Sequence, residues 1–387
     1  MRALEEELAE WDRASLRRTL PVVTRDAEDG GELAAFSSND YLGLARHPQV
    51  AEALRQAVAR HGAGAGASRL LGGTSAAHTR LEETLAAFKG TEAALVFSTG
   101  YAAAVGALGG LLRPGDVAVL DKLAHASLID GARLSGADIR VFAHNNPAQL
   151  EKRLAWAVGR AGEKGRVLVA TESVFSMDGD RAPLREIAAV ARRFGAMLLV
   201  DEAHSFGLCG RGGRGLSDAL GLTPEIGLHL GTLSKAVGLA GGYVCASRAA
   251  IEVITNRARS FIYSTAPPAA LAEAAAFVIG ELFPGPLGEE SRARLWCNAA
   301  HFAREMGQAA PPDSAIFPLI IGGEERALQA AAWLRAEGFA IPAIRYPTVA
   351  RGRARLRVSL SARHELAEID RLLACLRRLP DVPNFPA

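Results

Sequence analysis

The sequence predicts an α/β protein with a large domain built on a mostly parallel sheet, followed by a small C-terminal α/β domain. Short apolar runs alternate with alanine-rich helical stretches through the middle of the chain, a pattern typical of parallel strands covered by helices. The chain has 387 residues, of which 49% are hydrophobic and 22% charged, and this length suits a large domain plus a smaller one.

The domain boundaries follow changes in this pattern. We expect residues 1–48 to form an N-terminal helix and an extended arm, residues 49–285 to form the large domain, and residues 286–387 to form the small domain. The segment Pro284-Gly285-Pro286 predicts a hinge, because Pro and Gly interrupt helices and strands.

The first residues have the periodicity of an amphipathic helix. Leu4, Leu8 and Trp11 recur at helical spacing among Glu and Arg residues. We expect this helix to stop near Pro21, since proline cannot continue a helix.

Each predicted strand is a short apolar run. In the large domain these runs are Ala94–Phe97, Val117–Leu120, Ile139–Phe142, Val167–Thr171, Met197–Val200, Ile226–Leu230 and Gly242–Ala246. In the small domain they are Ile316–Ile321, Ala340–Ile344 and Leu356–Leu360.

Charge and cysteine content restrict the class of protein. The formal net charge is +2, which implies neither a nucleic-acid nor a membrane partner. No apolar run reaches the length of a membrane span, and the N-terminus has no signal-peptide core. The widely spaced Cys209, Cys245, Cys297 and Cys375 predict free, buried thiols in a reducing compartment, and therefore a cytoplasmic protein.

An acid and a lysine follow two of the predicted strands. Asp201 comes directly after Val200, and Lys235 comes shortly after Leu230. In an open α/β sheet both side chains project into the crevice at the carboxyl ends of the strands. A desolvated lysine amine can form an imine with an aldehyde, and a buried carboxylate can hold a protonated pyridine nitrogen. This pair suits pyridoxal 5'-phosphate (PLP).

The other lysines are weaker candidates for the imine. Lys122 is the one competitor, because it follows the strand Val117–Leu120, although it lies in a polar turn. Lys89, Lys152 and Lys164 lie at predicted helix ends or in a charged stretch, and we interpret them as solvated surface residues.

Further polar groups follow other strands. Gly100 and Tyr101 lie where a helix should begin, and backbone N–H groups at a helix N-terminus attract phosphate. Of the two histidines His125 and His204, one ring could stack on a flat cofactor, and the other could hydrogen-bond a carboxylate and orient it. The hydroxyl group of Ser176 could form a hydrogen bond with a phenolic oxygen.

Other classes of site have less support. The loop Gly62-Ala-Gly64-Ala-Gly66 follows a helix rather than a strand, so it lacks the setting of a dinucleotide loop and should line a cleft or a subunit contact. No metal is expected, because no further ligands converge on the histidines. No Gly-x-Ser-x-Gly segment occurs, which argues against a serine hydrolase. We interpret His78, His144 and His229 as structural.

Four segments around these residues match a known family: Thr232-Leu-Ser-Lys235-Ala, Asp201-Glu-Ala-His204, His125-Ala-Ser-Leu, and Ser173-Val-Phe-Ser176-Met-Asp-Gly-Asp180. With them the chain resembles, nearly from end to end, the α-oxoamine synthases. These are PLP-dependent enzymes of the aspartate-aminotransferase fold, fold type I. The resemblance therefore implies that residues 49–285 form a PLP-binding domain.

The resemblance implies a role for each site residue. The catalytic residues would be Lys235, which holds PLP, Asp201, which pairs with the ring nitrogen, and His125, which stacks on the ring. The other cofactor-binding residues would be Gly100, Tyr101, Ser176, His204 and Thr232, with Ser264 and Thr265 reaching the cofactor of the neighbouring copy in a homodimer. Substrate-binding residues would be Arg17, Asn39, His125, Thr348 and Arg357.

Within this family, Phe261–Thr265, Ser314–Ile320 and Ile344–Val349 favour an enzyme that condenses L-alanine with pimeloyl-CoA or a pimeloyl-carrier protein, with loss of CO2, in biotin biosynthesis. Many relatives have proline where Tyr346 and Ala350 stand, which bears on the acyl donor. A sister enzyme that uses glycine, such as glycine C-acetyltransferase or 5-aminolevulinate synthase, is the alternative. A non-catalytic PLP-binding protein and a nicotinamide dehydrogenase are more distant ones.

Overall fold

The computed structural model describes residues 2–20 and 33–379, and the chain divides into two compact units. The large unit consists of residues 42–176 and 180–293, and the small unit consists of residues 1–41, 177–179 and 294–387. These limits differ from the predicted boundaries at 48 and 285. The N-terminal arm groups with the small unit because its strand β1 (Ala34–Ala35) pairs with β10 (Phe339–Ala340).

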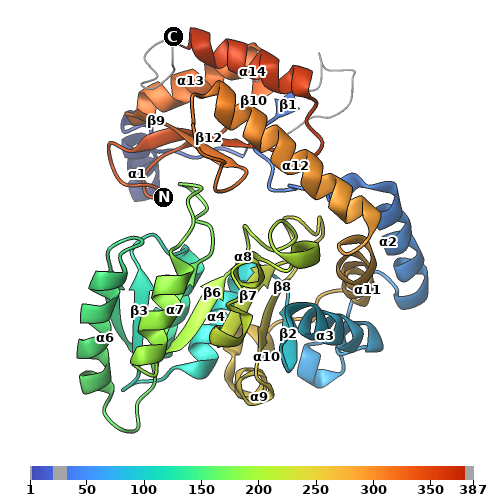
Figure 1. Ribbon diagram of the computed structural model, residues 1–387, viewed down its shortest axis with the longest axis vertical. Coiled ribbons are helices and arrows are strands. Elements are labelled where there is room, and N and C mark those ends of the chain that lie inside the picture. Colours follow the sequence, from blue (N-terminus) through green and yellow to red (C-terminus); the bar gives the residue numbers. More distant parts are fainter. Residues whose placement is uncertain (1, 21–32, 380–387) are drawn as a thin grey trace. The chain divides into compact units, whose positions relative to one another are not determined.

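A seven-stranded sheet forms the centre of the large unit (Figure 1). In spatial order its strands are β2 (Ala93–Phe97), β8 (Gly242–Ala246), β7 (Leu228–Thr232), β6 (Met197–Asp201), β5 (Val167–Glu172), β3 (Val117–Asp121) and β4 (Asp138–Phe142). Strand β8 is antiparallel to both of its neighbours, and the other pairs are parallel. The predicted α/β class with a mostly parallel sheet is confirmed.

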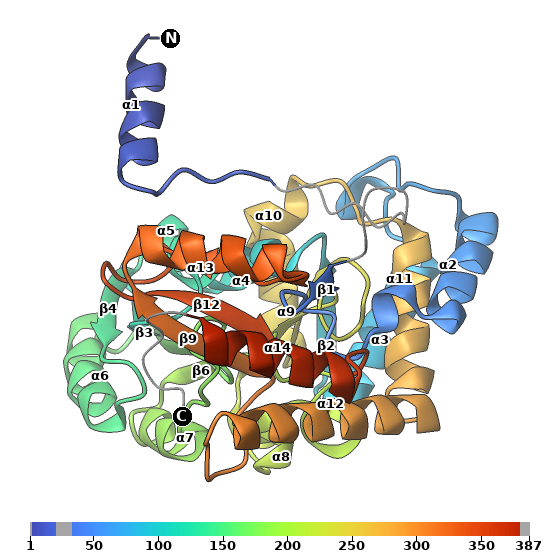
Figure 2. The same cartoon turned by 90° about the horizontal axis from the view of Figure 1, so that it is seen from above.

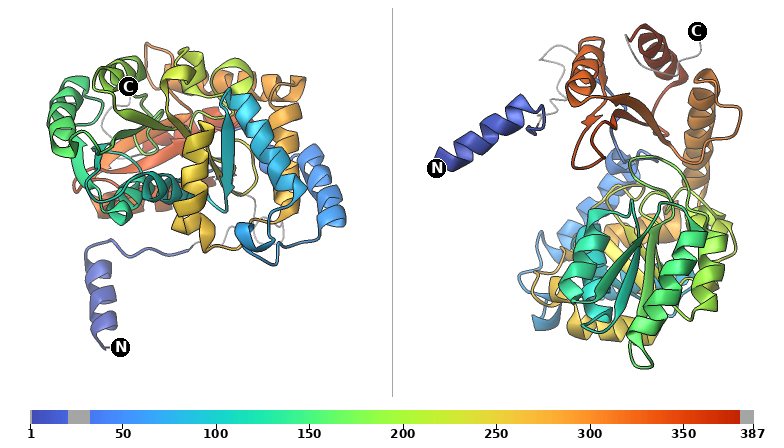
Figure 3. Two further views of the ribbon diagram at one scale, coloured as in Figure 1. Left: turned by 90° about the horizontal axis from the view of Figure 1, so that it is seen from below. Right: turned by 90° about the vertical axis from the view of Figure 1, so that its left-hand side faces the viewer.

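Helices cover both faces of this sheet (Figure 3). The α-helices of this unit before residue 286 are α2 (Pro48–His61), α3 (Ala76–Lys89), α4 (Gly100–Leu111), α5 (Ala126–Ser135), α6 (Pro147–Ala161), α7 (Leu184–Arg193), α8 (Leu216–Ala219), α9 (Arg248–Arg257), α10 (Arg259–Ile262) and α11 (Ala269–Phe277). Helices α4, α5, α9 and α10 share one hydrophobic core with the strands, whereas α6 and α7 share the core on the opposite face.

Helix α4 packs closely on the sheet because its residues are small. A Cβ atom added at Gly106 would meet the Phe97 ring at 2.6 Å, so only glycine fits there without a shift of that ring. This packing brings the N-terminus of α4, at Gly100, to the end of β7: a Cβ at Gly100 would lie 3.1 Å from the Cβ of Thr232.

The small unit has a three-stranded antiparallel sheet in the order β11 (Ala343–Ile344), β12 (Ala354–Ser359), β9 (Ile316–Gly322). Helices α13 (Glu324–Ala336) and α14 (Leu366–Arg378) lie over it (Figure 2). The sequence predicted one strand over Ala340–Ile344, but the structure has two short ones. Pro342 lies between them, and its missing N–H group interrupts the ladder.

Helix α1 (Arg2–Arg13) has the predicted amphipathic pattern but ends well before Pro21, which lies outside the described residues. Its apolar residues are partly solvent-exposed, with Leu4 at 59% and Trp11 at 45%. Helix α12 (Pro286–Glu305) begins at the predicted hinge.

The four cysteines are free, as expected, but only Cys245 and Cys375 are buried, whereas Cys209 is partly buried and Cys297 is exposed. Within residues 2–20 and 33–379 we find no single helix long and apolar enough to cross a membrane. Only Ala269–Leu282 together with α12, a pair bent by 80°, reaches that length and composition.

Candidate active site

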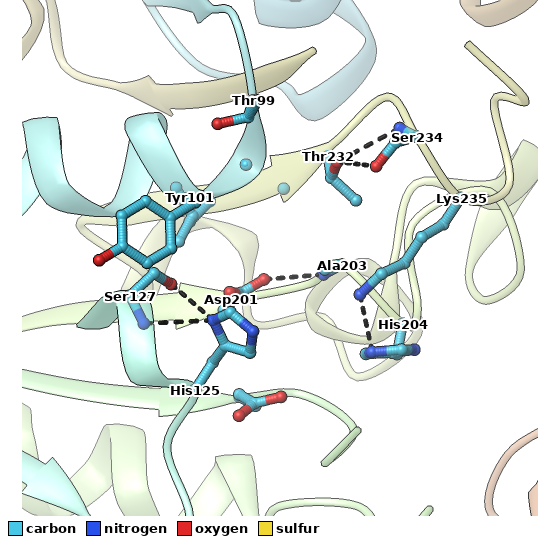
Figure 4. A pocket seen from close by; sticks show the side chains of 14 residues that line it. Thr99, Tyr101, His125, Ser127, Asp201, Ala203, His204, Thr232, Ser234 and Lys235 are labelled. Atoms are coloured by element: carbon cyan, nitrogen blue, oxygen red, sulfur yellow. Dashed lines mark hydrogen bonds between the residues drawn. The ribbon is translucent and has the colours of Figure 1, made fainter. Parts of the chain in front are cut away.

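A pocket lies at the carboxyl ends of β5, β6 and β7 in the large unit (Figure 4). Its lining comes from strand ends, from the loops that follow them and from the start of α4: Thr99, Gly100, Tyr101, His125, Ser127, Glu172, Asp201, Ala203, His204, Leu230, Gly231, Thr232, Ser234 and Lys235. This one pocket brings together seven of the predicted site residues, namely Gly100, Tyr101, His125, Asp201, His204, Thr232 and Lys235.

Asp201 and Lys235 face this same pocket. Asp201 is the last residue of β6, is 8% exposed, and its Oδ1 accepts a hydrogen bond of 2.9 Å from the Ala203 N–H. Lys235 lies in the loop after β7, with its Nζ 2.7 Å from Nε2 of His204. Burial raises the pKa of Asp201, while the positive charge of Lys235 opposes that rise. The pocket therefore holds a buried carboxyl group and a partly buried amine.

His125 stands at the N-cap of α5, and its ring is fixed by Ser127. Its Nδ1 accepts a hydrogen bond from the Ser127 N–H at 3.3 Å and lies 2.7 Å from the Ser127 Oγ. Burial lowers the pKa of His125, and the nearby charge of Asp201 opposes that change. Desolvation therefore favours the neutral ring, which is suited to stacking on a flat group.

The start of α4 forms another wall of the pocket. The Thr99 Oγ1 caps this helix by accepting from the Ala102 N–H at 3.0 Å. The first backbone N–H groups of an α-helix have no partner within the helix. Beside them, the Thr232 Oγ1 lies 2.7 Å from the Ser234 Oγ. Helix N–H groups next to hydroxyls are a common binding site for phosphate.

Tyr101 lies at the edge of the pocket. Its side chain is 50% exposed, and its hydroxyl donates a hydrogen bond of 2.8 Å to Asp130. Its backbone belongs to the first turn of α4, so it can contribute an N–H group while the ring points outward.

The donor set of this pocket fits PLP. It offers an amine for the aldehyde, a carboxylate for the ring nitrogen, a neutral imidazole for the ring face and helix N–H groups for the phosphate. The pocket also contains a buried polar atom, Oε1 of Glu172, that has no hydrogen-bond partner among the described residues. Across the described ranges, no cluster of three or more His, Cys, Asp or Glu residues is arranged to hold a metal ion.

The remaining predicted cofactor residues lie in the large unit but do not line this pocket. Ser176 follows β5 at the point where the chain enters residues 177–179 of the small unit. Ser264 and Thr265 follow α10, and Thr265 forms an isolated β-bridge with Ser68.

The predicted substrate residues Arg17, Asn39, Thr348 and Arg357 belong to the small unit. The guanidinium group of Arg357 is 4% exposed and donates to the Asn39 Oδ1 at 3.2 Å and to the Ser359 Oγ at 2.7 Å. The Thr348 Oγ1 accepts from Arg18 at 2.9 Å.

The sequence analysis missed Ser127, Glu172 and Ser234 as lining residues. A signal for Glu172 was present, because it follows the apolar run Val167–Thr171 as Asp201 follows Met197–Val200. The rule that selected Asp201 therefore also applies to Glu172.

The prediction that Lys89 is a surface residue was wrong. Its side chain is 1% exposed, and its Nζ forms an ion pair with Glu202 and donates to the Arg214 carbonyl oxygen. His229 joins this cluster through Nδ1, 3.1 Å from Oε2 of Glu202. Helix α3 ends at Lys89, and packing against the loop after β6 buries that end. A local sequence pattern cannot predict this burial, because it depends on a distant segment. The competing Lys122 is exposed and does not line the pocket.

Comparison with known proteins agrees with this fold and this pocket. The model of the aminotransferase class I and II family matches residues 32–376. The chain is also 43% identical to the 8-amino-7-oxononanoate synthase of Geobacter sulfurreducens, over 98% of both chains. It is 47% identical to the protein of that name from Methylorubrum populi, over 97% of this chain and 94% of the relative.

Solved structures give the same result. Serine palmitoyltransferase from S. paucimobilis, solved with bound PLP and myriocin, superposes with a TM-score of 0.89 at 33% identity, covering 97% of this chain and 96% of that one. The 8-amino-7-oxononanoate synthase of Francisella tularensis superposes with a TM-score of 0.73 at 26% identity, covering 89% and 98%.

The chain belongs to the aminotransferase class I and II family and is a PLP-dependent enzyme of fold type I. Within that family it is an α-oxoamine synthase, similar over nearly its whole length to the 8-amino-7-oxononanoate synthases.

Proposed function

We propose that this enzyme condenses L-alanine with a pimeloyl thioester to give 8-amino-7-oxononanoate, CO2 and the free thiol, as a step of biotin biosynthesis in the cytoplasm. The observation that carries this proposal is the identity of 42–47% to several 8-amino-7-oxononanoate synthases over at least 91% of the chain. The identity to serine palmitoyltransferase is lower, at 33%, although its fold superposes well.

Lys235 is the base in this proposal. When bound, PLP supplies an electron sink that lets the amino acid release its α-proton. The neutral Lys235 amine takes that proton and later returns one to the same carbon. Its hydrogen bond of 2.7 Å to His204 fixes the position of the Nζ between these two steps.

Asp201 holds the ring nitrogen of the cofactor in its protonated form. Opposite charges about 4 Å apart attract by about 4 kcal/mol at an effective dielectric constant of about 20. This energy corresponds to roughly three pKa units of preference for the protonated nitrogen, before desolvation reduces it. The His125 ring would stack on the face of the cofactor, and His204 and Ser176 would hydrogen-bond its phenolic oxygen.

The start of α4 binds the phosphate group. The N–H groups of Gly100 and Tyr101 and the hydroxyl of Thr232 supply donors, and the dipole of this 12-residue helix favours an anion at its N-terminus.

In the small unit, Arg357 binds the carboxylate of alanine, for which a guanidinium offers paired donors. Asn39, Arg17 and Thr348 contact the substrates. Tyr346 stands where many relatives have proline, and the guanidinium of Arg351 lies 4.3 Å from the centre of its ring. This cation–π contact orders the segment around Tyr346, which would contact the acyl substrate, and proline has no aromatic ring with which to form such a contact.

The functional form in this proposal is a homodimer in which Ser264 and Thr265 contact the cofactor of the other copy. The bridge from Thr265 to Ser68 ties this segment to the loop that carries Leu70 and Leu71. Leu71 is 83% exposed and Tyr263 is 71% exposed. Such apolar side chains are typical of a surface that a second copy covers.

A thiol-release assay tests the reaction. L-Alanine, glycine and L-serine are each paired with pimeloyl-CoA, acetyl-CoA and palmitoyl-CoA, and alanine is also paired with pimeloyl-carrier protein. We expect the highest kcat/KM for alanine with a pimeloyl thioester. Fastest release with glycine and acetyl-CoA, or with serine and palmitoyl-CoA, contradicts the proposal in favour of a sister enzyme. No release with any pair indicates a PLP-binding protein without this activity.

A further inference from the structure

The pocket contains a second buried carboxyl group, that of Glu172. Glu172 is the last residue of β5, and its Cα is the partner of Asp201 in the register between β5 and β6. Both side chains line the pocket, with Glu172 3% exposed and Asp201 8% exposed. Two carboxyl groups therefore end neighbouring strands and share one buried site.

The two groups have different partners. Asp201 has the Ala203 N–H and the charge of Lys235 in its favour. Glu172 has the backbone N–H of His125 and the charge of Lys235 in its favour and the charge of Asp201 against it, while its Oε1 is buried without a partner among the described residues. The charges that act on Glu172 include those of Asp201, Lys235 and Asp121, of which two are acids, and the titratable rings of His125 and His204 line the same pocket.

These surroundings do not support two ionised carboxylates. An ionised carboxylate that is buried and incompletely hydrogen-bonded is costly, and two adjacent ones repel each other. Burial raises the pKa of Glu172 well above its usual range, and the charge of Asp201 adds to that rise. Asp201 is the more exposed of the two and accepts the Ala203 N–H, whereas Oε1 of Glu172 has no partner among the described residues, so the proton belongs on Glu172.

We propose that Glu172 carries a proton in the native enzyme and acts as a positioning residue for Asp201, which is left as the ionised carboxylate of this pocket. The neutral acid keeps the negative charge at the place where a cationic ring nitrogen binds, and it prevents a second carboxylate from competing for that cation. This inference rests on the proposed function only in that PLP occupies the pocket.

The first test is the affinity of the apoenzyme for PLP, measured by fluorescence titration in Glu172→Gln and Glu172→Leu variants. Glutamine is neutral and similar in shape, so we expect a Kd within about threefold of that of the unmodified enzyme. Leucine leaves the His125 N–H without its acceptor, and the loss of a hydrogen bond to such a donor corresponds to a weakening of about tenfold or more. A glutamine variant that binds as weakly as the leucine variant shows that a charge is needed, and overturns the proposal.

The second test observes the proton directly and does not depend on the leucine variant. The infrared difference spectrum between the unmodified enzyme and Glu172→Gln at pH 7 should contain the C=O stretching band of a protonated carboxylic acid. In Asp201→Asn this band should disappear at a lower pH, because the neighbouring negative charge is gone. Absence of the band at pH 7 contradicts the proposal. Neither test uses an acyl thioester, so both can succeed even if the condensation assay fails.

Discussion

Nζ of Lys235 lies 2.7 Å from Nε2 of His204, within hydrogen-bonding distance, in the pocket that Asp201 also lines. Two cationic groups cannot form such a bond, because one of the nitrogen atoms must accept. At least one of the pair is therefore neutral. This contact and the position of Asp201 lead to the predictions below.

The Asp201→Asn variant should bind PLP but lose most of its turnover. Asparagine keeps the size of the side chain but removes the charge that favours a protonated ring nitrogen, and we expect kcat to fall about 100- to 1000-fold. PLP affinity by fluorescence and thiol release at saturating substrate measure the two effects separately. The surface variant Asp138→Asn is the control. Near-normal turnover in Asp201→Asn counts against the assigned role.

The His144 ring makes stability depend on pH. Its Nδ1 lies 2.9 Å from Asp121 and its Nε2 lies 2.8 Å from Asp180. Burial disfavours the charged ring, but the hydrogen bonds and charges of these carboxylates outweigh it and raise the pKa of His144 to about 10. The pKa in the folded state is thus higher than the unfolded value of about 6.5. The added stability is complete below about pH 6.5 and is lost as pH rises through about 10.

Urea unfolding of the apoenzyme and of a His144→Asn variant between pH 6 and pH 10 tests this linkage. We expect the variant to be less stable by about 1–3 kcal/mol at pH 6, with the gap closing toward pH 10. His47→Asn is a suitable control, since that ring only caps α2. A gap that stays constant over the pH range shows that the ring is neutral in the folded protein.

The buried ion pair between Lys89 and Glu202 should contribute strongly to the fold. Burial opposes the ionised form of Glu202, but the charge of Lys89 and the hydrogen bond with His229 hold its pKa well below the usual range. A Lys89→Met variant leaves this carboxylate buried without its cation, which costs about 3–5 kcal/mol. Lys152→Met, on the surface, should change the free energy of unfolding by less than about 0.5 kcal/mol. Equal unfolding midpoints for the two variants contradict this account.

Hybrid dimers test the shared site. A Lys235→Ala chain lacks the base, and a Thr265→Ala chain should impair the cofactor site of its neighbour. If Thr265 reaches the other copy, a mixture refolded together should regain activity, because one site of each hybrid dimer contains both native residues. Recovery no greater than the sum of the separate chains, or a monomer in sedimentation analysis, contradicts the shared site.

Much of the fold could be predicted from the sequence because its signals are local. Runs such as Val117–Leu120 are apolar and short, and each predicted run overlaps an observed strand. The predicted ends of strands were less accurate where they depend on pairing with another strand. Strand β7 continues through Thr232, beyond the predicted end at Leu230, because Thr232 pairs with Gly242 of β8. The same holds for Ala340–Ile344, where the two halves pair with different strands.

The pocket could be predicted in part for a related reason. Side chains that follow parallel strands converge at one edge of the sheet, so Asp201, His125 and Lys235 could be placed together from order alone. Burial by distant segments could not be foreseen. Lys89 precedes a glycine at a helix end and looks like a surface residue, yet a chain segment more than one hundred residues away covers it.

The central claim is that PLP binds to Lys235 in the pocket of Asp201. It is tested most directly by reducing the holoenzyme with borohydride, digesting it and locating the pyridoxyl group by mass spectrometry. We predict one modified peptide, with the group on Lys235, and no modification or visible absorbance band of bound cofactor in a Lys235→Ala variant. A pyridoxyl group on Lys122, or the same band and adduct in Lys235→Ala, would contradict the account.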